Sequence, residues 1–221
     1  MDRDKVDKHV TKTGTTTIGI VCKDGIVMAA DTRASAGYPN MVMHKQMEKV
    51  FIITDNIAVT TAGNVSDVQY VLKLIKAELK MKQLRTKNEA NVKEAASLMA
   101  MVSYENIRKF STIPGIAAFL VGGADKKGFW LYEVPPDGAL MQHKDYVCDG
   151  SGSVFALGVF EDSYKQDITT QEGVKLAVRA ISAALQRDTA TGSGMDVVVI
   201  DKKGARKVLS QEVKQVLVKR D

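Results

Sequence analysis

Hydrophobic residues along the chain follow a strand-like pattern in some segments and a helical pattern in others. Two runs rich in β-branched residues, 15–22 and 26–31, flank Lys23-Asp24-Gly25, and Asp-Gly between such runs is typical of a hairpin turn. A second hairpin is expected around Asp55-Asn56, between the runs 49–53 and 57–61. Further strands are expected at 116–122, 128–133, 139–147, 196–200 and 206–209.

Between these runs the spacing of the apolar residues changes to the helical period. Val68, Val71 and Ile75 form a stripe with spacings of three and four residues. Thr169 followed by Glu172 is a capping-box pattern, which indicates the start of a helix. Helices are therefore expected over 66–81, over 88–109 and from 169 to about 187, with a short terminal helix capped by Ser210.

The order of these elements indicates the class of fold. Strands, two helices, more strands, one helix and a final strand pair do not alternate as in a parallel α/β protein. Strands and helices in blocks favour antiparallel sheets covered by helical layers, which is the α+β class. With 221 residues and no linker rich in Pro, Gly or Ser, the chain is expected to form a single domain after a short leader.

Composition and charge exclude several classes of function. The net charge is +5, but lysines are scattered and paired with acids, as in KAELKMK, so no nucleic-acid partner is expected. No apolar run approaches the roughly 20 residues of a membrane-spanning helix, so no membrane association is expected. Residues 1–14 lack the apolar core of a secretory signal and are interpreted as a polar, removable leader.

The two cysteines, Cys22 and Cys148, also lack a motif. Neither belongs to a CxxC pair, so no zinc or redox site is indicated. Although one disulfide is formally possible, the sequence favours two reduced, buried thiols in a cytoplasmic protein.

The commoner catalytic motifs are missing from the sequence. There is no GxSxG, no phosphate-binding GxxxxGK[ST] and no HExxH, and none of the three histidines lies in a recognisable motif. A hydrolase without a histidine base can use a free α-amino group, whose pKa of about 7.7–8.0 leaves much of it neutral near pH 7. An N-terminal threonine then carries its own base beside its own hydroxyl.

The stretch TKTGTTTIGI offers such a threonine at Gly14-Thr15. A glycine before the cut lets the neighbouring hydroxyl approach its carbonyl, because glycine has no Cβ. Asp31 and Lys49, at the ends of nearby strands, supply an acid and a cation, and Gly63 lies where a strand turns into a helix with unpaired N–H groups. Each residue alone has an ordinary structural explanation, but together they favour an N-terminal threonine nucleophile.

The same residues resemble those of proteasome β subunits, most closely the archaeal type. The likeness covers the chain after Gly14 and rests on GTTTIGI, KDGIVMAADTRAS, EKVF, TTAGNVSD, GSGS at 150–153 and RAISAALQRDTATGSGMDVVVI at 179–200. The resemblance implies a four-layer αββα sandwich of the N-terminal nucleophile hydrolase class. It also implies a propeptide, residues 1–14, and a peptidase domain, residues 15–221.

Residue by residue, the resemblance implies the following roles. Thr15 matches the nucleophile, Asp31 and Lys49 its charged partners, and Gly63 the donor to the oxyanion. Ser151 and Asp188 match groups that support the terminal amine, and Thr191 stands where serine is usual. The substrate pocket would include Ala34, Ser35, Met47, Phe51, Thr61 and Val65, none of them charged, so cleavage after apolar residues is expected. The stretch 36–43 is about two residues longer than the family pattern.

The resemblance also implies partners and a reaction. Two seven-membered β rings enclose a chamber in the cytoplasm, α rings cap it, and an ATP-driven unfoldase delivers unfolded polypeptides. No metal or organic cofactor is required. Three alternatives stay open: an amidase that acts on small molecules through the same threonine, a ring subunit that never matures, and a plain α+β domain with a threonine-rich strand.

Overall fold

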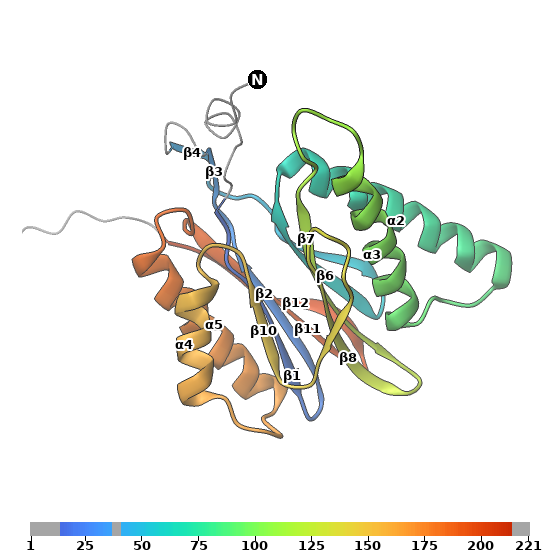
Figure 1. Cartoon of the computed structure of the whole chain (residues 1–221). Coiled ribbons are helices and arrows are strands. Elements are labelled where there is room, and N and C mark those ends of the chain that lie inside the picture. The colour runs from blue at the N-terminus through green and yellow to red at the C-terminus, as the bar shows by residue number, and fades with distance from the viewer. Residues whose placement is uncertain (1–13, 37–40, 214–221) are drawn as a thin grey trace, which may run out of the picture.

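Two five-stranded antiparallel sheets form the centre of the molecule (Figure 1). The structure is a computed structural model, and it describes residues 14–36 and 41–213. One sheet has the order β10-β1-β2-β11-β12 and the other β5-β6-β7-β8-β9. The first contains β1 (Thr17–Cys22), β2 (Gly25–Asp31), β10 (Tyr146–Asp149), β11 (Gly194–Asp201) and β12 (Gly204–Glu212). The second contains β5 (Val50–Thr54), β6 (Ile57–Gly63), β7 (Ala117–Asp125), β8 (Gly128–Val134) and β9 (Met141–His143).

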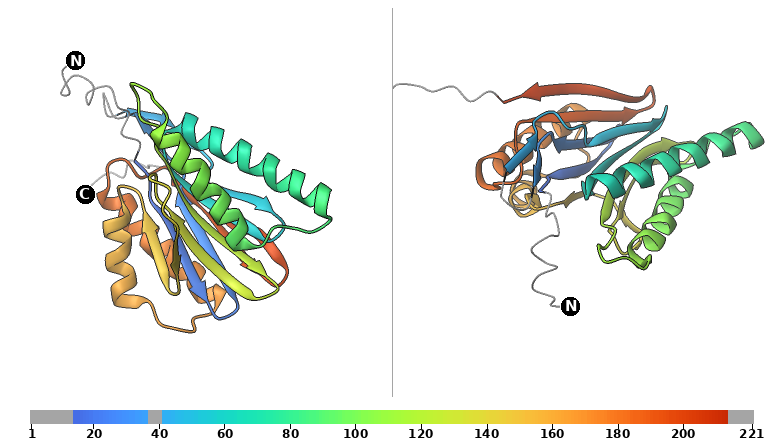
Figure 2. Two further views of the ribbon diagram at one scale, coloured as in Figure 1. Left: turned by 45° about the vertical axis from the view of Figure 1, so that its right-hand side comes forward. Right: turned by 90° about the horizontal axis from the view of Figure 1, so that it is seen from above.

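Helices cover the outer face of each sheet, which gives four layers (Figure 2). Helices α2 (Val65–Thr86) and α3 (Val92–Arg108) pack on the sheet of β5 to β9. Helices α4 (Ser153–Ser163) and α5 (Thr170–Arg187) pack on the other sheet. The expected α+β sandwich of the αββα type is therefore confirmed.

The period of the central strands explains why the layers stack in this way. In β2, Val27 and Ala29 face the core under α4 and α5, while Ile26 and Met28 face the core between the sheets. All seven residues of this strand are buried. A strand that is apolar on both faces must be covered twice, once by helices and once by the other sheet.

Most of the expected elements are confirmed. Both predicted hairpins are present, as β1–β2 and β5–β6. The third predicted helix is α5, and Thr169 and Glu172 form the predicted capping box at its start. Helix α3 begins later than predicted, because Asn91 caps it with a second capping box.

Other expectations about the elements are wrong. The single strand predicted over 139–147 is two strands, β9 and β10, which belong to different sheets. Residues 210–212 continue β12, paired with β11, so the terminal helix does not begin after Ser210. The rest of that predicted helix, 214–221, and the leader, 1–13, lie outside the described residues.

Helix α4 and a small two-stranded sheet were not predicted. Helix α4, with the sequence SVFALGVFEDS, is apolar on most sides and has no side-chain hydrogen bond at its N-cap, Gly152, so neither a stripe nor a cap marks it. Strands β3 (Ala34–Ala36) and β4 (Met41–His44) are only three and four residues long, which is too short for a periodic signal.

Candidate active site

The candidate residues of the sequence meet where β1 begins and β2 ends. Because β1 and β2 are antiparallel neighbours, Thr16 lies beside Asp31. The Asp31 N–H donates to the Thr16 carbonyl at 3.1 Å, and the Thr16 N–H donates to Asp31 Oδ1 at 3.1 Å. The register of this hairpin places the Asp31 carboxylate next to the Thr15–Thr16 peptide, one residue after the expected cut.

A buried ion pair joins Asp31 to Lys49, just before β5. Lys49 Nζ lies 2.8 Å from Asp31 Oδ1, and the two side chains are 6% and 0% exposed. Asp31 also accepts backbone N–H groups of Thr16, Arg33 and Gly192, at 3.1, 3.0 and 3.0 Å. Burial lowers the pKa of the Lys49 ammonium below its ordinary value, and the Asp31 carboxylate offsets part of this effect.

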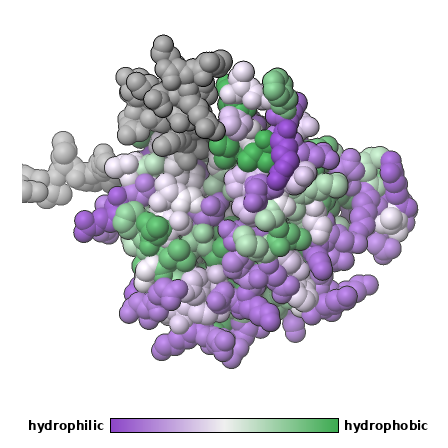
Figure 3. Space-filling model, in the orientation of Figure 1, coloured by the Kyte–Doolittle hydropathy of each residue, from purple (hydrophilic) through white to green (hydrophobic). Residues whose placement is uncertain are grey.

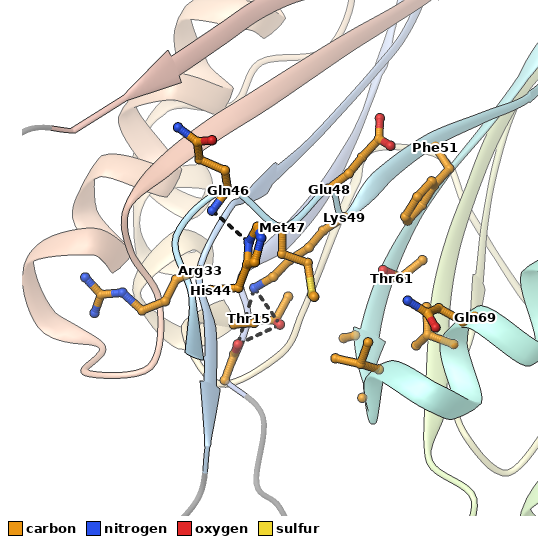
Figure 4. A pocket seen from close by; sticks show the side chains of 16 residues that line it. Thr15, Arg33, His44, Gln46, Met47, Glu48, Lys49, Phe51, Thr61 and Gln69 are labelled. Carbon is orange, nitrogen blue, oxygen red and sulfur yellow. Dashed lines mark hydrogen bonds between the residues drawn. The ribbon is translucent and has the colours of Figure 1, made fainter. Parts of the chain in front are cut away.

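Lys49 also reaches the threonine that the sequence singles out (Figure 4). Its Nζ lies 2.9 Å from Thr15 Oγ1 and 3.3 Å from the Gly14 carbonyl oxygen. With Asp31 as the third partner, the three protons of the ammonium group all have acceptors. The Thr15 hydroxyl donates to the same Gly14 carbonyl at 2.7 Å. The Thr15 hydroxyl, the Lys49 ammonium and the Gly14 carbonyl of the expected cut site are thus in direct contact.

Glycines allow this close packing around Thr15. A Cβ on residue 14 would lie 1.7 Å from the Cβ of Ala190, which is far too close for two non-bonded atoms. Gly150 has a φ of +93°, and a Cβ there would lie 2.1 Å from the Thr15 carbonyl oxygen. The close approach to Ala190 is a structural reason for Gly14 beyond the approach of the hydroxyl to its carbonyl.

The three remaining candidates form a hydrogen-bonded group behind Thr15. Ser151 Oγ and Thr191 Oγ1 both donate to Asp188 Oδ2, at 2.6 and 2.5 Å. The Thr15 N–H donates to Ser151 Oγ at 3.3 Å. The structure therefore brings Ser151, Asp188 and Thr191 to the side of Thr15 that carries its nitrogen.

A cavity of about 280 Å³ opens beside Thr15. Figure 4 shows Thr15 and Lys49 on one side, Phe51, Thr61 and Gln69 across from them, and Met47 reaching into the space between. Gly63 lines this cavity. So do five of the six residues expected in the substrate pocket: Ala34, Met47, Phe51, Thr61 and Val65. Ser35 is not among the lining residues, because its side chain turns away and donates to the Ala190 carbonyl at 3.2 Å.

The lining also contains residues that sequence reasoning missed: Arg33, His44, Gln46, Glu48, Ala62, Val68 and Gln69. Val68 and Gln69 lie three and four residues after Val65 on α2, so the helical period could have identified them. Arg33, His44 and Glu48 carry charged or titratable groups, so the whole cavity is less apolar than the residues expected from the sequence.

Three features of the described residues bear on other kinds of site. Across residues 14–36 and 41–213, no three His, Cys, Asp or Glu side chains lie together as metal ligands would. Among the helices of the same residues, none combines the length and the apolar character needed to cross a bilayer. Both cysteines are free thiols; Cys22 is buried and Cys148 half-buried.

Comparison with known proteins identifies the family. The sequence matches the family described as Proteasome subunit over residues 11–200. The chain belongs to the proteasome subunit family. It is 42% identical to a proteasome subunit beta of Ferroglobus placidus over 99% of both chains. It is 43% identical to a proteasome subunit beta of Methanobrevibacter smithii, over 93% of this chain and 96% of the relative.

A third archaeal relative, a proteasome subunit beta of Archaeoglobus profundus, is 41% identical over 97% of this chain and 95% of its own length. The alignments with these proteasome relatives cover 93–99% of this chain. The chain is a proteasome β-type subunit, which assigns it to the peptidase core of the proteasome.

Proposed function

We propose that the chain is a threonine endopeptidase whose nucleophile is Thr15, exposed by removal of residues 1–14. One observation carries this proposal: Thr15 Oγ1 lies 2.9 Å from the buried Lys49 ammonium and 2.7 Å from the carbonyl of the peptide bond to be cut. An activated hydroxyl within reach of a polarised carbonyl is the geometry that acyl transfer requires.

The contacts support a route for the removal of the leader. Thr15 Oγ1 attacks the Gly14 carbonyl carbon and gives up its proton to the Thr15 nitrogen, while the Lys49 ammonium, 3.3 Å from the Gly14 carbonyl oxygen, stabilises the negative charge that develops there. The C–N bond breaks as the Thr15 nitrogen receives a proton, which leaves Gly14 as an ester on Thr15 Oγ1. Water then hydrolyses this ester and releases residues 1–14, so that a free amine is formed at Thr15.

The same groups support the hydrolysis of substrates. The free amine takes the Thr15 hydroxyl proton, and Ser151, held by Asp188, orients the amine. Oγ1 attacks a substrate carbonyl, the substrate amine leaves with a proton, and water hydrolyses the acyl ester on Thr15. We assign the oxyanion contact to Gly63, which lines the cavity. Only glycine fits there, because φ is +118° and a Cβ would lie 2.3 Å from the Ile116 carbonyl oxygen.

The cavity supports a preference for cleavage after apolar residues. Met47 from the segment between β4 and β5, Phe51 from β5 and Val65 from α2 give it apolar walls. Such walls discriminate only weakly between side chains of similar size, about 10- to 200-fold per methylene group. Arg33 and Glu48 lie on the lining too, and we expect them to contact substrate backbone or flanking residues rather than the residue before the cut.

We further propose assembly into stacked seven-membered β rings capped by α rings, with an ATP-driven unfoldase delivering unfolded chains. Large apolar side chains are exposed on α3 (Tyr104), in the segment that follows it (Phe110 and Ile113) and on α4 (Val154), which supports burial against other subunits. On the face seen in Figure 3, hydrophobic areas form separate patches within a largely hydrophilic surface. The free thiols support a reducing, cytoplasmic environment.

The intact mass of the chain after assembly with its α partner tests the proposal. A chain that starts at Thr15 is expected, together with a mass increase of one adduct after treatment with a peptidyl electrophile. Thr15→Ala should keep the full-length mass and hydrolyse no peptide, while Thr17→Ala, at the first residue of β1, serves as the matched control and should be processed. An active, processed Thr15→Ala would exclude Thr15 as the nucleophile.

A panel of peptide and small-amide substrates separates the proposal from an amidase of small molecules. Hydrolysis of unfolded proteins and of peptides with apolar residues before the cut is expected. A preference for small amides over every peptide would favour the amidase instead.

A further inference from the structure

The residue after the nucleophile, Thr16, is completely buried and does not line the cavity. Its hydroxyl lies 2.7 Å from Thr191 Oγ1. We infer that Thr16 is a positioning residue whose hydroxyl sets the hydrogen bonding of Asp188 and, through Ser151, of the Thr15 amine. This inference rests on the proposed function, because the amine matters only if Thr15 is the nucleophile.

The protons in this group can be counted, and the count fixes their direction. A carboxylate only accepts hydrogen bonds, so Thr191 and Ser151 must each give their single hydroxyl proton to Asp188 Oδ2. Since the Thr191 proton is already used, the proton between Thr16 and Thr191 must come from Thr16. Ser151 likewise has only lone pairs left for Thr15, so it accepts the Thr15 N–H at 3.3 Å.

Two chains of hydrogen bonds therefore end on one carboxylate oxygen. One runs from Thr16 through Thr191, and the other runs from the Thr15 nitrogen through Ser151. Hydrogen bonds in such a chain polarise one another, so the Thr16 donor strengthens the bond from Thr191 to Asp188. A stronger hydrogen bond from Thr191 leaves less negative charge on Asp188 for the second series of hydrogen bonds, which runs through Ser151 to the Thr15 amine.

The packing around Thr16 leaves space for its hydroxyl beside that of Thr191. A Cβ on residue 152 would lie 2.0 Å from Thr16 Oγ1 and 3.0 Å from Thr191 Oγ1, so Gly152 leaves the space in which the two hydroxyls meet. The backbone N–H of Thr16 also donates to Asp31 Oδ1, the oxygen that holds Lys49. Thr16 thus connects the group behind the Thr15 nitrogen to the group that contacts its hydroxyl.

The inference predicts an effect on the pH dependence of turnover. Asp188, after α5, is linked to the Thr15 nitrogen through Ser151, and Lys49, before β5, contacts the Thr15 hydroxyl. The charges that act on Lys49 are Asp31 at the end of β2, Asp188, and Arg33 after β2. Loss of the Thr16 hydroxyl leaves more charge on Asp188, which favours the protonated amine and removes the base. The acid limb of the kcat profile should therefore move to higher pH.

Thr16→Val and Thr16→Ser in the assembled particle test this inference. Thr16→Val keeps the shape and removes the donor, so kcat should fall about five-fold, the value of one hydrogen bond, with KM within about two-fold of the wild type. Thr16→Ser keeps the donor and should restore both kcat and the pH profile. Thr60→Val is the matched control, because the Thr60 hydroxyl is buried in β6 and has no hydrogen-bond partner among the described residues.

The outcomes separate the inference from the proposed function. An inactive wild type, or an active Thr15→Ala, would refute the proposed function itself. With an active wild type and an inactive Thr15→Ala, the inference is overturned if Thr16→Val keeps the wild-type profile, if Thr16→Ser behaves like Thr16→Val, or if Thr60→Val shows the same shift. If Thr16→Val does not assemble, Thr16→Cys, a weaker donor, should give a smaller shift in the same direction, and an unshifted profile there overturns the inference.

Discussion

The unequal contacts of Asp31 and Lys49 predict unequal costs when either is removed. In Lys49→Met the stem is kept, and Asp31 remains buried with three backbone N–H donors. Removing one partner of a buried ion pair costs about 3–5 kcal/mol of unfolding free energy. The three remaining donors stabilise the carboxylate, so we expect the lower end, about 3 kcal/mol.

Asp31→Ala should cost more than Lys49→Met. It removes the acceptor of the N–H groups of Thr16, Arg33 and Gly192 as well as the partner of Lys49. Each buried N–H without an acceptor costs about 1–3 kcal/mol, whereas Lys49 can lose its charge because burial already lowers its pKa. The sum is about 5 kcal/mol or more, mostly from the orphaned N–H groups.

Thermal unfolding in a Thr15→Ala background, in which no variant is processed, measures both costs at one fixed chain concentration. About 2–4 °C per kcal/mol for a chain of this size gives a fall in Tm of about 6–12 °C for Lys49→Met and about 10–20 °C for Asp31→Ala. Lys207→Met is the matched control, since Lys207 is 38% exposed where it pairs with Asp196, and it should cost about 1 kcal/mol or less. A smaller cost for Asp31→Ala than for Lys49→Met would refute the reasoning.

Three further predictions follow from contacts outside this pair. Thr169→Ala removes the cap of α5 and should cost about 1 kcal/mol, or about 2–4 °C in Tm. Burial raises the pKa of the Cys22 thiol from 9.0 to about 12 and also raises the pKa of the Cys148 thiol. Because the thiols of the unfolded chain lose their protons at lower pH than those of the folded chain, the free energy of unfolding should be highest below about pH 9 and should fall between about pH 9 and 12. Thiol-reactive reagents should not label the folded chain at about pH 8. Gly14→Ala forces its new Cβ against Ala190, so leader removal, followed by intact mass, should slow at least about ten-fold, and unchanged processing would contradict the geometry.

The comparison of α5 with α4 shows how far the sequence predicts the fold. Helix α5 has a polar outer face and a capping box, so its period and its start are both visible in the sequence. Helix α4 buries Ala156 and Phe160 but exposes Val154, and it has no cap, so its apolar residues carry no period. The strand predicted over 139–147 failed for a related reason: the sequence does not show to which sheet each half will pair.

The site shows the same division between local and distant information. Gly14-Thr15 is visible in the sequence as a glycine directly before a threonine, and Asp31 and Lys49 lie at the ends of strands whose hairpins are visible in the sequence. Gly14 and Ala190 are far apart in the sequence, so no local sequence pattern predicts their close approach. Ser151, Asp188 and Thr191 were found only through the resemblance to a family, because they meet Thr15 through tertiary contacts alone.

The intact Gly14–Thr15 bond explains why the proposed enzyme would be silent before processing. With the bond intact, Thr15 is only 4% exposed and its hydroxyl donates to the Gly14 carbonyl, so the hydroxyl is neither accessible to a substrate nor beside a free base. Lys49 already touches both the hydroxyl and that carbonyl, and these are the contacts that the first cut requires. The cut removes residue 14 from the cavity and creates the amine next to Ser151 in a single event. In the proposed mechanism, access for the substrate and the base for catalysis therefore arise together, and peptidase activity would be confined to chains that have lost the leader.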